Sequence, residues 1–93
     1  MNIMIYWEGK VMEKALIVLA SSSAVHAVKT MLEKRYRIYS KIIQAPSVIS
    51  QSGCSYCIEI DKSELRTAVN LIKVSDMSIR GIYDSVTYQK ISL

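Results

Sequence analysis

The sequence KALIVLA, at Lys14–Ala20, holds a continuous apolar run that ends at a serine triplet, residues 21–23. A short apolar run with a polar boundary is typical of a central strand that is buried on both faces of a sheet. A serine hydroxyl at this boundary can accept a hydrogen bond from the backbone N–H groups that begin a helix. The sequence therefore predicts a core strand that leads directly into a helix, and the fold is expected to be built outward from this strand.

The residues after the serines repeat at helical spacing. Five apolar side chains fall on one face of the predicted helix: Ala24, Val25, Val28, Met31 and Leu32. This spacing lets one face of a helix pack on a sheet while the polar residues meet solvent. His26, the only histidine of the chain, lies on the polar face, and we expect a solvated side chain there rather than a ligand or a base.

The second half of the chain shows two more strand patterns, a second helix pattern and a last strand. These predicted elements are a strand at Ile38–Gln44, a polar loop at Ser47–Ser55, a strand at Tyr56–Ile60, a helix after Asp61 and a strand from Ile79 to Tyr83. Pro46 has no N–H group to donate and ends the first of these strands. Asp61 and Glu64 have the spacing of a capping box. The last strand can continue through Val86 and Tyr88.

The predicted order is strand, helix, strand, strand, helix, strand. It is the order of the ferredoxin-like βαββαβ fold, an α+β sandwich whose antiparallel sheet carries both helices on one face. We expect this domain at residues 14–85. Residues 1–13 are an N-terminal extension, either a strand or a loose end, and residues 86–93 are a C-terminal extension that can add a strand.

The composition describes one small domain. The chain has 93 residues, of which 51% are hydrophobic, and a net charge of +4. The longest apolar run, Ala15–Ala20, is six residues, far short of a membrane span, and the N-terminus does not resemble a secretory signal. We therefore expect a cytoplasmic protein without a membrane partner, in which the cysteines are reduced thiols, redox-active groups or ligands.

Basic residues concentrate at one place only, around the end of the first predicted helix. They are Lys34, Arg35, Arg37 and Lys41. Cations suit the negative end of a helix dipole, so we expect a solvated helix end rather than a nucleic-acid site.

Both cysteines lie in the segment QAPSVISQSGCSYCI at residues 44–58, which also holds the only proline. Cys54 and Cys57 form a C-x-x-C pair, whose spacing allows a disulfide or the binding of a soft metal. Because side chains alternate along a strand, Tyr56, Ile58 and Ile60 are expected to face the helices and Cys57 the open side of the sheet. Cys54 and Cys57 are the candidate thiol-carrier or redox residues. The alternative is that Cys57 is a small apolar strand residue and Cys54 an incidental loop residue.

Other chemistries find little support in the sequence. A structural zinc site normally needs four protein ligands, so Cys54 and Cys57 could bind a metal only if two chains shared their pairs. Copper chaperones of the same topology carry C-x-x-C between the first strand and the first helix, where this chain has serines. The three glycines are scattered and form no phosphate loop, and no Ser-His-Asp or paired-carboxylate spacing supports a hydrolase. The first core strand lacks the aromatic residues on which RNA bases stack. We expect no cofactor, no nucleic-acid partner and no classical enzyme.

The sequence resembles the selenium/sulfur carrier-like proteins, a small bacterial family. The resemblance covers about residues 14–83 and rests on Ala20-Ser21-Ser22, on Pro46 with Ile49-Ser50, on Cys54 and on Gly81-Ile82-Tyr83. Ser55 stands where the family often has glycine, and Cys57 adds a second thiol. The resemblance implies a thiol that carries sulfur or selenium.

Three hypotheses follow from these observations. The leading one is a small carrier or accessory protein in which Cys54 bears the chalcogen and Cys57 is its neighbour, with a sulfur or selenium donor or acceptor enzyme as its protein partner. The second is a non-catalytic interaction or regulatory module that binds another chain on the open face of the sheet, and the third is a dimer that binds metal through C-x-x-C. We expect a homodimer or larger assembly, because the open face and the alternating apolar residues near both ends offer surface and strand edges.

Overall fold

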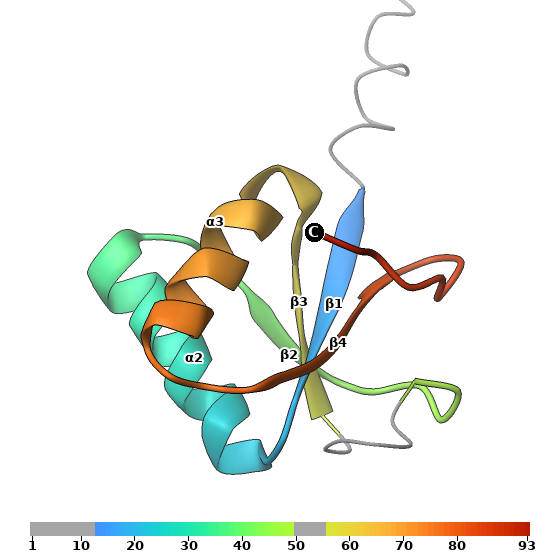
Figure 1. Ribbon diagram of the computed structural model, residues 1–93, viewed down its shortest axis with the longest axis horizontal. Helices are drawn as coiled ribbons and strands as arrows, with labels where there is room; N and C mark the ends of the chain where they lie inside the picture. Colours follow the sequence, from blue (N-terminus) through green and yellow to red (C-terminus); the bar gives the residue numbers. More distant parts are fainter. Residues whose placement is uncertain (1–12, 50–55) are drawn as a thin grey trace, which may run out of the picture.

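The computed structural model describes residues 13–49 and 56–93 and shows an α+β fold of two layers. Its elements are β1 (Lys14–Leu19), α2 (Ser22–Tyr36), β2 (Lys41–Gln44), β3 (Tyr56–Asp61), α3 (Lys62–Val74) and β4 (Ile79–Asp84). The strand order is β2-β3-β1-β4, and every neighbouring pair is antiparallel. Both helices lie on the same side of this sheet (Figure 1). The predicted α+β class, antiparallel sheet and two covering helices are therefore present.

β1 lies inside the sheet, between β3 and β4, and is buried on both faces. Ala15, Ile17 and Leu19 belong to a core that the two helices cover, which we call the helix-side core. Leu16 and Val18 point to the opposite face and belong to a second, smaller apolar cluster. The prediction of a central strand with two buried faces is confirmed.

α2 begins and packs as its sequence predicts. Ser21 is the N-cap, and its Oγ accepts a hydrogen bond from the backbone N–H of Ala24 at 3.2 Å. Val25, Val28 and Leu32 are fully buried against the sheet. The helix ends at Tyr36 because the next residue, Arg37, adopts a left-handed backbone conformation, with φ 57°.

α3 begins where predicted, at Lys62, but the predicted capping box is wrong. Asp61 is the N-cap residue, yet its side chain makes no capping hydrogen bond. Asp61 is also the last residue of β3 and stands opposite Lys14 of β1, whose Nζ donates to Asp61 Oδ1 at 2.7 Å. The cross-strand ion pair thus takes the carboxylate that the capping box would have used.

Two details of the middle strands differ from the prediction. β2 begins at Lys41 rather than at Ile38, because the chain is still leaving the left-handed end of α2, although Ile38 does pack into the helix-side core. Tyr56 was expected to face that core with Ile58 and Ile60, but it is 46% exposed. It is the first residue of β3, at the end of the sheet.

β4 ends at Asp84, so its predicted continuation through Val86 and Tyr88 is wrong. The chain turns back after Asp84, and the backbone N–H of Tyr88 donates to the Asp84 carbonyl oxygen at 3.0 Å. Lys90 then forms an antiparallel bridge with Tyr83, and the Ile91 N–H donates to the Ile82 carbonyl oxygen at 2.7 Å. The residues after β4 therefore fold back along its edge instead of extending it.

The left-handed backbone conformation of Arg37, at the end of α2, can be tested by substitution. We predict that Arg37→Gly raises the free energy of unfolding by up to about 1 kcal/mol, because glycine adopts positive φ without the steric cost that an L side chain bears. Urea unfolding followed by circular dichroism measures this difference.

Lys34→Gly is the matched control, since Lys34 lies within the last turn of α2 and has a helical backbone. There glycine is expected to lower the free energy of unfolding by about 1 kcal/mol. A less stable Arg37→Gly variant would contradict this account of the helix end.

Candidate functional site around Cys57

Cys57 lies on the sheet face opposite the helices, at the second position of β3. Its cross-strand neighbours are Val18 of β1 on one side and Ile43 of β2 on the other. Successive side chains of a strand point to opposite faces, and Ile58 and Ile60 accordingly belong to the helix-side core. The sequence therefore placed Cys57 on the correct face.

That face is not open around Cys57. The cysteine is 0% exposed and belongs to the second apolar cluster, which we call the outer cluster: Leu16, Val18, Ala45, Ile49 and Cys57, with Ile43 and Tyr83 packed against them. The expectation of an open sheet face is wrong here. The sequence after β2 reads as a polar loop, but two apolar side chains of this segment, Ala45 and Ile49, pack against the sheet.

The segment Ala45–Ile49, here called the cover segment, follows β2 directly and lies on the side of the sheet away from the helices (Figure 1). Ala45 is 9% exposed and Ile49 is 4% exposed, whereas Val48 between them is 59% exposed. The N–H of Ile49 donates to the Pro46 carbonyl oxygen at 3.0 Å and closes a turn within the segment. The cover segment is thus held to the sheet at both of its ends by apolar side chains.

Tyr83 completes the outer cluster from β4. A Cβ atom at Gly81 would lie 2.7 Å from Tyr83 Cε1 and 2.8 Å from the Tyr83 hydroxyl oxygen, so the tyrosine ring lies across the glycine. Gly81 stands opposite Val18, which itself stands opposite Cys57. The ring therefore occupies the same cross-strand row as Cys57, one strand beyond Val18.

Two further residues were singled out from the sequence, Cys54 and His26. Cys54 lies outside the described residues. His26 lies on α2, on the other side of the sheet, where it is exposed, and its Nδ1 is 2.9 Å from the Ser22 carbonyl oxygen. Within residues 13–49 and 56–93, no group of three or more His, Cys, Asp or Glu side chains could hold a metal ion.

A family model described as "Putative Se/S carrier protein-like" matches residues 14–84. The match runs from the first residue of β1 to the last residue of β4. The chain belongs to this family. No curated protein and no solved structure matches the chain.

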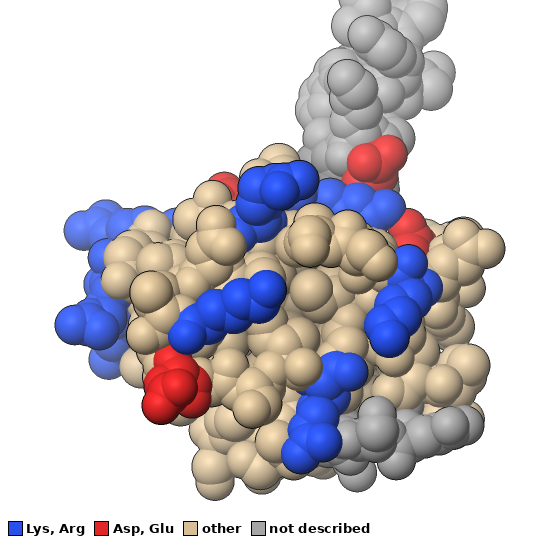
Figure 2. Space-filling view, viewed as in Figure 1, with Lys and Arg blue, Asp and Glu red and all other residues tan. Residues whose placement is uncertain are grey.

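The surface of this Se/S carrier-like protein agrees with the charge pattern of its sequence. Lys and Arg gather at the left edge of Figure 2, over the C-terminal end of α2, where Lys34 and Arg35 lie in the last helical turn. Lys34, Arg35, Arg37 and Lys41 are all exposed, as expected for a solvated helix end. None of the described helices has the length and apolar character needed to cross a membrane.

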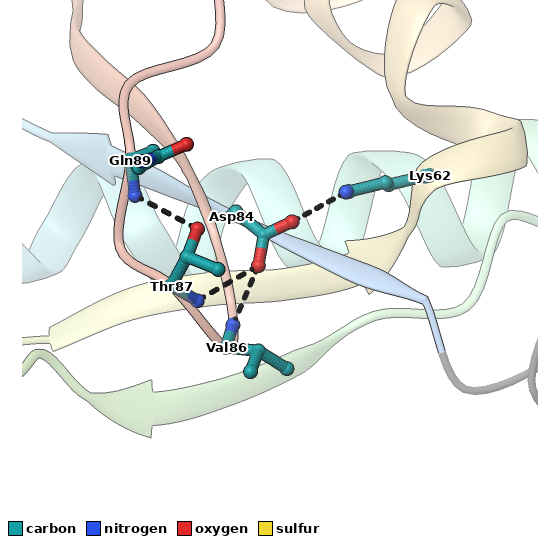
Figure 3. Close-up of polar contacts among 5 residues, drawn as sticks. All are labelled: Lys62, Asp84, Val86, Thr87 and Gln89. Atoms are coloured by element: carbon teal, nitrogen blue, oxygen red, sulfur yellow. Dashed lines mark hydrogen bonds and ion pairs between the residues drawn. The ribbon is translucent and has the colours of Figure 1, made fainter.

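A polar cluster at the C-terminal end of β4 was not predicted from the sequence. Asp84 Oδ1 accepts hydrogen bonds from the N–H groups of Val86 at 2.8 Å and Thr87 at 3.0 Å, and Asp84 Oδ2 accepts one from Lys62 Nζ at 2.5 Å (Figure 3). Gln89 N–H donates to Thr87 Oγ1 in the same turn. The sequence signal was Asp84 itself, because an aspartate often accepts from the N–H groups two and three residues later.

These contacts set the charge state of the cluster. The Lys62 ammonium, followed by the N–H groups of Thr87 and Val86, holds the pKa of Asp84 well below its usual range. The carboxylate in turn raises the pKa of Lys62. The pair connects the first residue of α3 to the last residue of β4, so we assign it a structural role in closing the C-terminal turn.

The lowered pKa of Asp84 makes a pH prediction. A carboxyl whose pKa is lower in the folded than in the unfolded protein stabilises the fold above its unfolded pKa, and this stabilisation is lost as pH falls through about 4 and below. We therefore expect Asp84→Asn to be less stable than wild type at pH 7 and the difference to shrink at acidic pH. Thermal unfolding from pH 7 to pH 2.5 measures it.

Asp76→Asn is the control, because Asp76 is an exposed turn residue with positive φ, which asparagine also tolerates. We expect it to follow the wild-type pH dependence. If Asp84→Asn also did so, the assigned role of Asp84 would be wrong.

Proposed function

We propose that the protein is a small thiol-based sulfur or selenium carrier, or an accessory protein of such chemistry, with Cys54 as the residue that bears the chalcogen. The observation that carries this proposal is the family match, which spans all six elements of the fold. Cys57, three positions after Cys54, lies in β3, so the segment that holds Cys54 leads directly into this strand. This placement supports the proposal.

The proposed framework for this chemistry is a ferredoxin-like domain. The supporting observations are the βαββαβ element order and the strand order, which reads β4-β1-β3-β2 from the other edge of the sheet. In such a framework the connection between β2 and β3 lies at one end of the sheet. Cys54 belongs to that connection by its position in the sequence.

Burial divides the two thiols between different roles. The thiolate is the reactive form of cysteine, and an apolar environment disfavours it. Cys57 is 0% exposed among apolar side chains, which suits a structural residue better than a primary nucleophile. We therefore propose Cys54 as the group that accepts the chalcogen, and Cys57 as a second thiol that acts only after it.

The proposed transfer uses a persulfide or selenosulfide of a donor protein. The Cys54 thiolate attacks the terminal sulfur of the donor persulfide, so that a Cys54–S–SH persulfide forms and the donor leaves as a thiolate. No net oxidation occurs, because the sulfane sulfur passes from one thiol to another. The donor and the acceptor are thus proposed protein partners, and the compartment is proposed to be the cytoplasm, where thiols stay reduced.

The two alternatives have less support. A metal bound between two chains would need Cys57 as a ligand, and this side chain is buried within its own chain. An interaction module would be favoured by a continuous apolar surface. Among the described residues the most exposed large apolar side chains are Val74 at the end of α3, Val86 after β4 and Tyr39 before β2. A homodimer or larger assembly stays a prediction, to be checked by light scattering.

The carrier proposal predicts a mass gain at one cysteine. After incubation with a cysteine desulfurase and cysteine, we expect intact-protein mass spectrometry to show wild type with one added sulfur atom, about 32 Da, because a Cys54 persulfide would form. Cys54→Ser should gain none.

Cys57→Ala is the matched control, since alanine keeps a small apolar residue at this buried position and leaves Cys54 in place. It should gain at least as much sulfur as wild type does. If wild type gains no sulfur, or if Cys54→Ser gains as much as wild type, the carrier proposal fails and the interaction module becomes the better account.

A further inference from the structure

Cys57 is shielded from solvent by the side chains of the outer cluster. Within the sheet, Val18 and Ile43 flank it on the neighbouring strands. The described members of the outer cluster come from β1, from β3 and from the cover segment. The cover segment supplies Ala45 and Ile49. Opening of the cover segment would therefore remove two of the described side chains that pack in the cluster around Cys57.

The cover segment is held by much less apolar packing than the helices. Among the described residues, the helix-side core contains 14 buried side chains and the outer cluster contains five, of which the cover segment supplies two. Val48, between these two, points toward solvent at 59% exposure. A segment with few buried contacts opens at a lower free energy than the domain unfolds. No residue of the cover segment belongs to the helix-side core.

We propose that the cover segment, Ala45–Ile49, opens locally while the rest of the domain stays folded, and that Ile49 is the residue that controls access to Cys57. The inference rests on the proposed carrier function and assigns Cys57 a place in it. The second thiol is kept from reacting until the cover segment moves.

The chemical step that opening permits is the release of the carried sulfur. The Cys57 thiolate attacks the Sγ atom of Cys54, so that the bond between this Sγ and the outer sulfur breaks, a Cys54–Cys57 disulfide forms, and the outer sulfur leaves as hydrosulfide. The two sulfur atoms of the cysteines are oxidised to the disulfide, and the sulfane sulfur is reduced to sulfide. A dithiol reductant then returns the disulfide to two thiols. When the cover segment is closed, the persulfide persists and can be handed to an acceptor.

The test measures alkylation of Cys57 alone, in Cys54→Ser protein, with iodoacetamide as the probe. We expect Cys57 to react faster than global unfolding allows, and the dependence of its rate on urea to be much weaker than the equilibrium unfolding slope, because local opening exposes little surface. Adding Ile49→Ala should speed the reaction at least about tenfold, since its buried side chain holds the cover segment closed.

Two further variants separate local opening from general destabilisation. Val48→Ala changes an exposed side chain of the same segment and should leave the rate unchanged. Val28→Ala removes a fully buried side chain of the helix-side core and should lower global stability without speeding alkylation at low urea. The proposal is overturned if the alkylation rate follows global unfolding in all variants, or if Ile49→Ala reacts no faster than Val48→Ala. Because this assay involves no sulfur transfer, its result is independent of the persulfide experiment.

Discussion

The burial of β1 on both faces is the constraint on which the rest of the structure depends. One face of this strand, with Ala15, Ile17 and Leu19, needs the helices, and the other, with Leu16 and Val18, needs a different cover. If only the helix face of the sheet were covered, Leu16 and Val18 would be exposed to water. The chain meets this need with its own residues, by returning the segment after β2 to the sheet. The environment of Cys57 is a consequence of that second layer.

The outer cluster determines the surroundings of Cys57. Cys57 stands beside Val18 in the strand register, so any cover that shields Val18 also shields the cysteine. The Tyr83 ring, lying across Gly81, extends the same layer to the edge strand β4. Because the Cys57 side chain is out of contact with solvent, we expect reagents to reach its thiol slowly. In the proposed mechanism this slowness is useful, because a second thiol that reacted at once would discharge every persulfide as soon as it formed.

Periodicity predicted the helix-side half of the fold well, because there local pattern and burial agree. The stripe of α2, the serine N-cap and the alternation at Ile58 and Ile60 all depend on neighbours along the chain. The failures had separate causes. Asp61 pairs with Lys14 instead of capping α3, and Asp84 turns the chain where an alternating pattern suggested a longer strand. The cover segment was not predicted because Ala45, before the predicted polar loop, and Ile49, within it, show no periodicity. Cys54 was singled out from sequence and lies outside the described residues.

The central proposal is that Cys54 is the reactive thiol, whereas Cys57, three positions later, is shielded by the fold. The most direct test is to treat wild-type protein briefly with iodoacetamide in native buffer, quench the reaction, and map both cysteines by peptide mass spectrometry. The account predicts that Cys54 is alkylated nearly completely before Cys57 is alkylated appreciably, and that both react at similar rates in denaturant. Equal alkylation of Cys54 and Cys57 in the native protein would contradict it.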